Sequence, residues 1–145
     1  MEQVCWTRRP LPTVSPGPLV TWEQELRTPI DLTVSRHHLR RMVHTRWLRH
    51  RAPVDVDGLL LVYEELTSNG LRHGRSPVHV RVTATGGGWL VDVIDAAVEQ
   101  PPATAGDRDP ADGGLGLPLV ARLCRAHGWT VEDGRKHVWA RVQAA

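Results

Sequence analysis

The sequence predicts an α+β fold, a two-layer α/β sandwich in which helices cover one face of a mostly antiparallel, mixed sheet. Two observations indicate this architecture. Two segments with helical periodicity follow one another between residues 35 and 73, and two hairpin patterns come later, with turns at 86–88 and 133–134. Helices and hairpins therefore segregate along the chain instead of alternating, which disfavours a parallel, dinucleotide-binding sheet.

Composition restricts the class of protein. With 145 residues, of which 41% are hydrophobic and 23% charged, the chain has the size of one globular domain. No apolar run is long enough to span a membrane, and Met1–Trp6 lacks the pattern of a secretory signal. Cys5 and Cys124 have no metal-type spacing, which favours a reducing compartment. We therefore expect a cytoplasmic protein. A net charge of +2 is too small to predict nucleic-acid binding.

The first part of the chain is expected to form an arm, a strand and a helix. Four prolines and no periodicity predict a flexible N-terminal arm at 1–19, followed by one domain at 20–145. Residues 21–27 are suited to an edge strand. Ser35 is a suitable N-cap for a helix that extends to about residue 51.

After a second helix, described below, the chain predicts two hairpins separated by a loop and a third helix. The expected elements are strands at 77–85 and 89–94, a long loop at 98–113, a helix at 117–127, and strands at 129–132 and 137–142. A loop of this length in a compact domain is usually functional or mobile.

The second expected helix carries the most informative pattern. Asp55 or Asp57 caps it, and Gly74 is expected to end it in the left-handed conformation. Its apolar positions share one broad face that we expect to be buried, and they are Leu59, Val62, Tyr63, Leu66 and Gly70.

Glu65, Asn69 and His73 are spaced i, i+4 and i+8, and they form a polar line along the flank of that face. An asparagine oxygen is a hard ligand suited to Mg²⁺. A glutamate one turn earlier can orient or deprotonate an attacking hydroxyl or water. The line therefore indicates a metal–phosphate site, with a solvated stripe at the helix boundary as the alternative.

Two further segments are candidates for ligand contact. Glycines in the stretch Gly113–Leu117 let the backbone approach a ligand, and the first N–H groups of the following helix point at an anion. This is not a P-loop, and an ordinary loop-to-helix junction is the alternative. Asp95 ends a strand, where its carboxylate can accept a hydrogen bond from an exocyclic amine and so favour adenine over guanine. Aspartate at a strand end is also a common turn former.

Taken in order, three motifs resemble the N, G1 and G2 boxes of the gyrase/chaperone/histidine-kinase ATPase superfamily. They are EELTSNGLRHG at 64–74, DVIDAA at 92–97 and GGLGLPLV at 113–120. The ending GRKHVWARV at 134–142 is similar to small stand-alone bacterial domains that resemble anti-sigma-factor serine kinases. The resemblance covers roughly residues 20–143.

The resemblance implies an α/β sandwich that binds ATP with Mg²⁺, and a lid where the long loop lies. By position, Glu65 matches the catalytic glutamate, Asn69 the Mg²⁺-binding asparagine and Asp95 the adenine-binding aspartate. The other nucleotide-binding positions of the match are His73, Ala97, Gly114, Leu115, Gly116 and Leu117.

Departures from the family pattern leave two functions open. Ala97 and Glu99 replace both glycines of Asp-x-Gly-x-Gly, Leu115 stands where a basic residue is frequent, and Gly70 follows Asn69 in place of alanine. The first hypothesis is a serine/threonine kinase that phosphorylates a small anti-sigma antagonist and, in its ATP state, sequesters a sigma factor. The second is a nucleotide-binding interaction module with a degraded site, which regulates a partner without chemistry.

The first expected helix is strongly basic. It carries His37, His38 and His44 and six arginines, namely Arg36, Arg40, Arg41, Arg46, Arg49 and Arg51. A solvated face is the simplest interpretation, an acidic protein partner comes next, and nucleic acid is the least expected. The resemblance implies a protein partner, either a sigma factor or an anti-sigma antagonist, and leaves a homodimer open.

Overall fold

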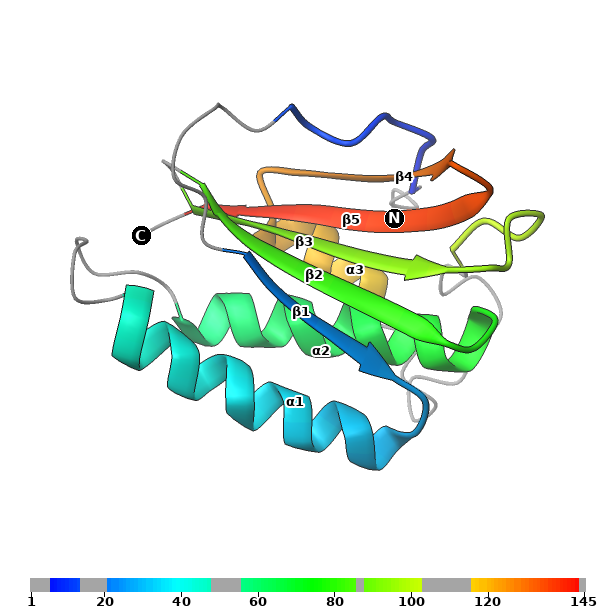
Figure 1. Ribbon diagram of the computed structural model, residues 1–145. Coiled ribbons are helices and arrows are strands. Elements are labelled where there is room, and N and C mark those ends of the chain that lie inside the picture. The colour runs from blue at the N-terminus through cyan, green and yellow to red at the C-terminus, as the bar shows by residue number, and fades with distance from the viewer. Residues whose placement is uncertain (1–5, 14–20, 48–55, 86–87, 103–115, 144–145) are drawn as a thin grey trace.

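The computed structural model describes residues 6–13, 21–47, 56–85, 88–102 and 116–143 of the chain. These residues form a five-stranded antiparallel sheet with three α-helices packed on one of its faces (Figure 1). The predicted α+β sandwich is therefore confirmed.

The sheet has the strand order β1–β2–β3–β5–β4. Its strands are β1 (Thr21–Leu26), β2 (Val78–Thr85), β3 (Gly88–Asp95), β4 (Ala126–Glu132) and β5 (Arg135–Gln143). Val78, Val80 and Val82 alternate along β2 and are fully buried against the helices, as their spacing predicts. Asp133 and Gly134 join β4 to β5 with φ angles of 52° and 72°, which suit a two-residue hairpin turn.

Helix α2 is the centre of the helical layer. The helices are α1 (Pro29–Met42), which continues as a π-helical segment at Val43–Trp47, α2 (Val56–His73) and α3 (Gly116–Leu123). α2 contacts both other helices and strands β2, β3 and β5. The apolar face predicted for it is buried throughout, at Leu59, Val62, Tyr63, Leu66 and Gly70. Across the described ranges, no helix is long and apolar enough to cross a membrane.

Helix α1 begins at Pro29, so the prediction that Ser35 caps it was wrong. Thr28 is the N-cap, and its hydroxyl accepts a hydrogen bond from the N–H of Asp31. The Asp31 carboxylate in turn accepts one from the N–H of Thr28. This reciprocal capping box, with proline at the first helical position, is a stronger start signal than a single serine.

The predicted C-terminal ends of α2 and α3 also differ from the structure. Gly74 follows α2 without a positive φ, so the expected left-handed end was wrong. α3 ends at Leu123 and not at about residue 127, because β4 already pairs with β5 at Ala126, opposite Arg141. The expected end of the first helix near residue 51 lies outside the described residues.

Residues 6–9 of the predicted arm lie along the outer side of β4 (Figure 1). Two backbone hydrogen bonds, of 2.9 and 3.2 Å, join this segment to Trp129 in a parallel arrangement. Trp6 is only 6% exposed and packs on the core. These residues therefore differ from the expectation of a flexible arm, whereas 1–5 and 14–19 lie outside the described part of the chain.

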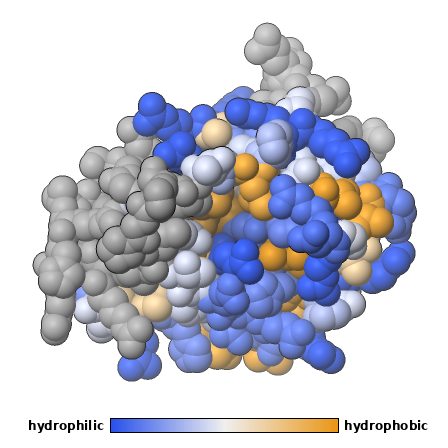
Figure 2. Space-filling model, turned by 45° about the horizontal axis from the view of Figure 1, so that its top comes forward, coloured by the Kyte–Doolittle hydropathy of each residue, from blue (hydrophilic) through white to orange (hydrophobic). Residues whose placement is uncertain are grey.

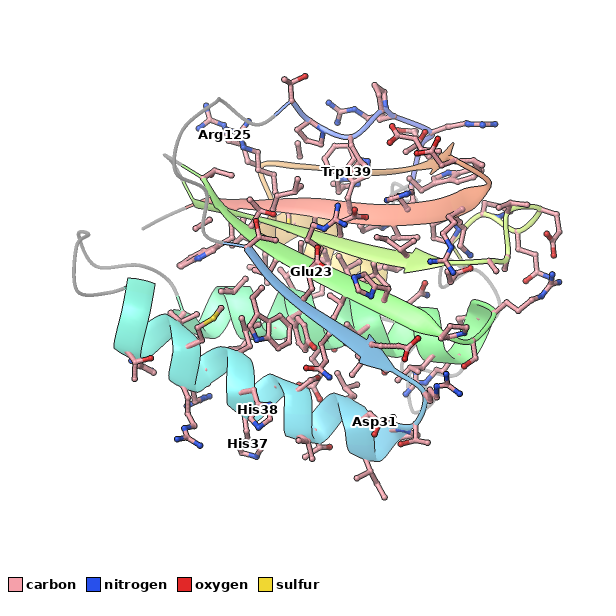
Figure 3. The ribbon with its side chains drawn as sticks, in the orientation of Figure 1. Glu23, Asp31, His37, His38, Arg125 and Trp139 are labelled. Carbon is pink, nitrogen blue, oxygen red and sulfur yellow. The ribbon has the colours of Figure 1, made fainter. Side chains whose placement is uncertain are left out.

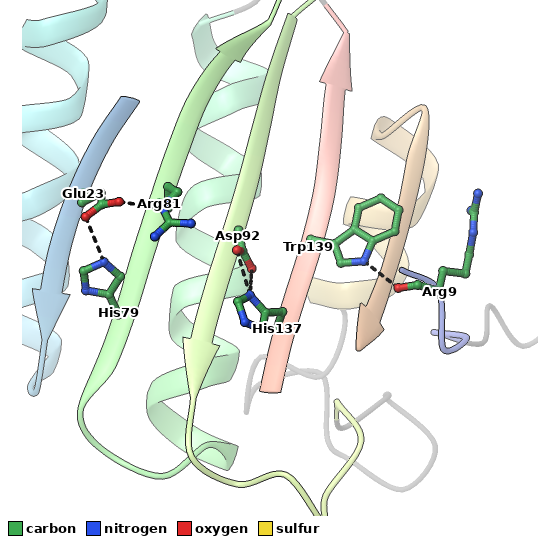
Figure 4. A network of polar contacts seen from close by, with 7 residues as sticks. All are labelled: Arg9, Glu23, His79, Arg81, Asp92, His137 and Trp139. Atoms are coloured by element: carbon green, nitrogen blue, oxygen red, sulfur yellow. Dashed lines mark hydrogen bonds and ion pairs between the residues drawn. The ribbon is translucent and has the colours of Figure 1, made fainter. Parts of the chain in front are cut away.

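The sheet face away from the helices carries cross-strand polar pairs. Arg81 donates to Glu23 at 2.6 Å, and His137 Nδ1 lies 2.9 Å from the Asp92 carboxylate (Figure 4). The hydrogen bond from Arg81 lowers the pKa of Glu23. Burial lowers the pKa of His137, but Asp92 and Glu132 raise it more, so the net shift is upward. Figure 2, with this side turned forward, shows apolar patches between hydrophilic residues.

A buried hydrogen bond of 2.6 Å between the Ser35 and Tyr63 hydroxyls joins α1 to α2. Ser35 donates its single proton to the carbonyl of Leu32 at 2.9 Å, so Tyr63 is the donor of the shared bond. Burial raises the pKa of Tyr63, although the bond to Ser35 opposes this, and the phenol stays protonated.

This geometry predicts unequal effects of removing the two hydroxyls. Ser35→Ala leaves the buried Tyr63 O–H without an acceptor and should lower the free energy of unfolding by about 1–3 kcal/mol. Tyr63→Phe leaves Ser35 bonded to Leu32 and should cost less, about 0.5–1.5 kcal/mol. Urea unfolding of both variants and of the double variant measures this. Equal single effects that add in the double variant would contradict the assignment of Tyr63 as the donor.

Candidate functional site

The polar line predicted on α2 lies at the flank of its buried face. Glu65, Asn69 and His73 are each half-buried, between fully buried neighbours on one side and exposed Glu64 and Arg72 on the other. The three side chains therefore occupy the boundary of the core, where a ligand can reach them and water is partly excluded. Asn69 and His73 each make polar contacts with other residues.

The structure brings Glu65 against the start of α3. A Cβ atom added to Gly116 would collide with Glu65 Oε2, so a side chain at this position would displace the carboxylate. Burial raises the pKa of the Glu65 carboxyl, the charge of Glu64 raises it further, and Arg72 opposes the rise. A carboxyl with an elevated pKa at a helix N-terminus is suited to accept a proton from a nearby hydroxyl.

The first turn of α3 is fixed by burial and by a hydrogen bond from the N-terminal segment. Gly116 and Leu117 are both buried, and the Leu117 carbonyl accepts a hydrogen bond of 3.3 Å from the indole N–H of Trp6. The N-terminal segment therefore helps to fix the helix start that faces Glu65. Gly114 and Leu115, the other predicted phosphate-side residues, lie outside the described part of the chain.

Asp95 lies at the end of β3 and is only 1% exposed. Its Oδ1 accepts a hydrogen bond of 2.7 Å from the N–H of Ala97. Its Oδ2 accepts no hydrogen bond among the described residues, and the Nζ atom of Lys136 lies 3.4 Å away from it. The predicted base-binding carboxylate is thus buried, with one oxygen committed to the backbone and the other facing an ammonium group.

Gly74 places α2 directly beneath this carboxylate. A Cβ atom added to Gly74 would lie 2.6 Å from Asp95 Oδ2, closer than real Cβ contacts allow. Glycine is needed here for close approach, which replaces the predicted left-handed turn as the reason for its presence. Asp95 therefore lies directly against the end of α2, next to His73, the last residue of the polar line.

Ala97 and Glu99, which replace the two glycines of the family pattern, form contacts that stabilise the turn after β3. Ala97 is 3% exposed and supplies the N–H that binds Asp95. The Glu99 carboxylate forms an exposed ion pair of 2.8 Å with Arg75, which follows the end of α2. Such an exposed pair adds at most about 1 kcal/mol to stability, but it joins this turn to the end of α2.

Sequence reasoning missed Lys136 and Trp6. Lys136 is the only lysine of the chain, and the alternation of β5 places it on the same face as buried Val138 and Ala140. That alternation indicates that Lys136 is buried. It was not followed because a lysine is rarely fully buried unless it is paired. Trp6 is preceded and followed by segments without periodicity, so no local pattern indicated its burial.

The basic surface of α1 is mostly exposed. Arg36 forms an ion pair of 3.2 Å with Glu64 of α2. His37 and His38 point away from the sheet (Figure 3), and Arg40 and Arg41 are also exposed. This surface lies apart from the polar line, because the line flanks the other side of α2 from the Arg36 contact. The side chains of the remaining arginines expected on this helix lie outside the described residues.

The residues present fit the nucleotide and Mg²⁺ that the resemblance implies. Asp95 Oδ2 is a buried acceptor without a hydrogen bond, which a base amine can satisfy. Gly116 has no side chain, which lets the Glu65 carboxylate lie against the start of α3, where backbone N–H groups can bind phosphate. The amide oxygen of Asn69 is a ligand type that Mg²⁺ accepts together with phosphate oxygens and water.

Comparison with known families agrees with this arrangement. A model of the histidine kinase-like ATPase domain matches residues 31–142, which extend from the first turn of α1 to β5. The match covers more than half of the chain and includes the α2 line, Asp95 and the start of α3. A comparison with curated proteins found no match. The chain belongs to the histidine kinase-like ATPase domain family, which implies that it binds ATP, typically with Mg²⁺.

Proposed function

We propose that this protein is a cytoplasmic ATP-dependent regulator, a serine/threonine kinase of the anti-sigma-factor type that acts on a small antagonist protein. Family membership supports the ATP-binding part. The observation that best supports catalysis is the contact between Glu65 and the start of α3. It puts a carboxylate with a raised pKa beside a helix N-terminus that can hold phosphate.

Each site residue has a distinct part in this proposal. Asp95 accepts a hydrogen bond from the base amine, beside Ala97, and Asn69 is the protein ligand of Mg²⁺. Bound ATP supplies the phosphoryl group. Glu65 orients the hydroxyl of the substrate serine or threonine and accepts its proton. The residues assigned to the sugar and phosphate side are His73, Gly114, Leu115, Gly116 and Leu117.

The raised pKa of Glu65 bears on its role as a base. A general base is most effective when its pKa is close to the working pH, because it must be deprotonated and still bind a proton well. Burial moves the Glu65 pKa upward from its ordinary value, toward that range. Glu64, one position earlier, is exposed and pairs with Arg36, so it faces away from this chemistry.

A second function, a nucleotide-binding module that regulates its partner without phosphoryl transfer, is favoured by the surroundings of Asp95. Lys136 faces the free oxygen of this carboxylate, and Ala97 and Glu99 hold the adjacent turn in place of glycines. These contacts indicate a degraded nucleotide site, which is what a module that regulates its partner without chemistry would have. For either function we propose a protein partner, a sigma factor or an anti-sigma antagonist.

Substitutions on α2 separate the two functions. Asn69→Ala should weaken nucleotide binding chiefly when Mg²⁺ is present, because the lost amide oxygen is the proposed metal ligand. Glu65→Gln should leave binding nearly intact and lower the rate of phosphoryl transfer or ATP hydrolysis by about 10²–10⁴-fold, the usual contribution of a general base. Calorimetric titration with and without Mg²⁺, followed by a phosphate-transfer assay, measures both.

Glu64→Gln is the matched control, since it removes a carboxylate one position away that is exposed and pairs only with Arg36 among the contacts described. It should bind like the wild type and lose far less rate than Glu65→Gln, because it removes only the smaller of the two causes that raise the Glu65 pKa. If the wild type transfers no phosphate and hydrolyses no ATP, while Glu65→Gln and Asn69→Ala bind like it, the kinase function fails. The binding module is then preferred.

Gly116→Ala tests whether Glu65 and α3 act together. The added methyl group displaces the Glu65 carboxylate, the far end of a flexible side chain, so we expect a loss of about 0.5–1.5 kcal/mol in unfolding free energy, the cost of a side chain moved away from its preferred rotamer. In a Glu65→Ala background the collision is removed and the same substitution should cost much less. Thermal unfolding of the four proteins gives the comparison. Equal losses in both backgrounds would show that Glu65 does not contact α3 in solution.

A further inference from the structure

Lys136 is a buried cation whose ammonium group contacts a backbone carbonyl and a carboxylate. It is 2% exposed, and its ammonium donates a hydrogen bond of 3.0 Å to the carbonyl of Gln100. The same nitrogen lies 3.4 Å from Asp95 Oδ2. The strand places it there, because β3 and β5 pair with Asp95 directly opposite Lys136.

The two oxygens of Asp95 are not equivalent. Oδ1 is occupied by the Ala97 N–H at 2.7 Å, and the Arg75 N–H approaches it at 3.5 Å. Oδ2 faces Lys136 and lies over Gly74. Oδ2 is therefore the oxygen without a hydrogen bond among the described residues and the better acceptor for a base amine, and it is the oxygen that the ammonium faces.

Removing the charge of Lys136 has a definite electrostatic consequence. A carboxylate that is 1% exposed is strongly unfavourable without a counter-ion. Lys136 supplies that counter-ion within the chain, so Asp95 does not depend on a ligand for its compensation. An arriving amine therefore meets an oxygen whose charge the ammonium already compensates, and the net gain from its hydrogen bond is small.

We propose that Lys136 is a specificity-determining residue of the base site, whose ammonium competes with the exocyclic amine of a nucleotide base for Asp95 Oδ2. This inference rests on the proposed function, since it takes Asp95 as the base-binding residue. As a result, the wild-type protein discriminates weakly between a 6-amino and a 6-oxo purine nucleotide. A 6-oxo purine places a carbonyl oxygen where an amine would donate, so it forms no hydrogen bond to the Oδ2 acceptor.

The test is the ratio of Kd values for Mg·GTP and Mg·ATP, measured by calorimetric titration. Lys136→Met keeps the length of the side chain and removes its charge. It should raise the GTP-to-ATP ratio by about tenfold or more, the effect of one charge-assisted hydrogen bond. Adding Asp95→Asn to this variant should abolish the gain.

Arg135→Met is the matched control, because it removes the same charge from the adjacent, exposed position of β5. It should leave the ratio unchanged, as should Lys136→Arg, which keeps the charge. If Lys136→Met does not fold, Lys136→Gln takes its place, with a smaller increase expected.

If the ratio of the Kd values for GTP and ATP is unchanged or lower in Lys136→Met or Lys136→Gln, Lys136 does not compete with the base amine. Lys136 would then be either a structural residue or a hydrogen-bond donor to the base. Failure of every variant and of the wild type to bind either nucleotide would instead contradict the proposed function, and this inference with it. The two failures are therefore distinguishable.

Discussion

Helix α2 and the residue that follows it lie so close to the sheet that neither Gly70 nor Gly74 can be replaced by a residue with a side chain unless neighbouring atoms move. A Cβ atom on Gly70 would lie 2.9 Å from Val93 Cγ1, and one on Gly74 would lie 2.6 Å from Asp95 Oδ2. This close packing sets the end of α2 under the end of β3. On the same helix, Glu65 meets the start of α3 at Gly116. The site therefore depends on a packing constraint as much as on its polar residues, because a more distant helix would separate Asp95 from the polar line.

The layers of the fold and the polar line could be predicted because each follows from the regular spacing of apolar or polar residues within one helix or strand. The apolar face of α2 and the alternating valines of β2 need no information from elsewhere in the chain. Element ends were less predictable, since β4 extends back to Ala126 only through its pairing with β5. Thr28 was overlooked although its capping box with Asp31 is visible in the sequence. The partner of Lys136 could not be predicted, because strand register determines that it lies opposite Asp95.

Under the proposed function, nucleotide affinity and catalysis would depend on separate residues. Asp95 and Lys136 lie at one end of α2, where they would determine how much the base contributes to binding. Glu65 lies in the middle of the helix, against α3, where it would determine whether a hydroxyl can be activated. A buried ion pair adds little net stability but is costly to break from one side. A chain of this family can therefore lose base recognition while its fold and its catalytic carboxylate are retained, or lose catalysis while it still binds.

We infer that the second half of α2, the turn after Asp95 and the first turn of α3 form one nucleotide site. Backbone hydrogen exchange with and without saturating Mg·ATP tests this inference, because it reports on all three segments in a single experiment. We expect exchange to slow at the end of α2, around Ala97 and at the start of α3, with α1 and β4 unchanged. Slowing confined to the basic surface of α1, or no change in these three segments, would contradict the account.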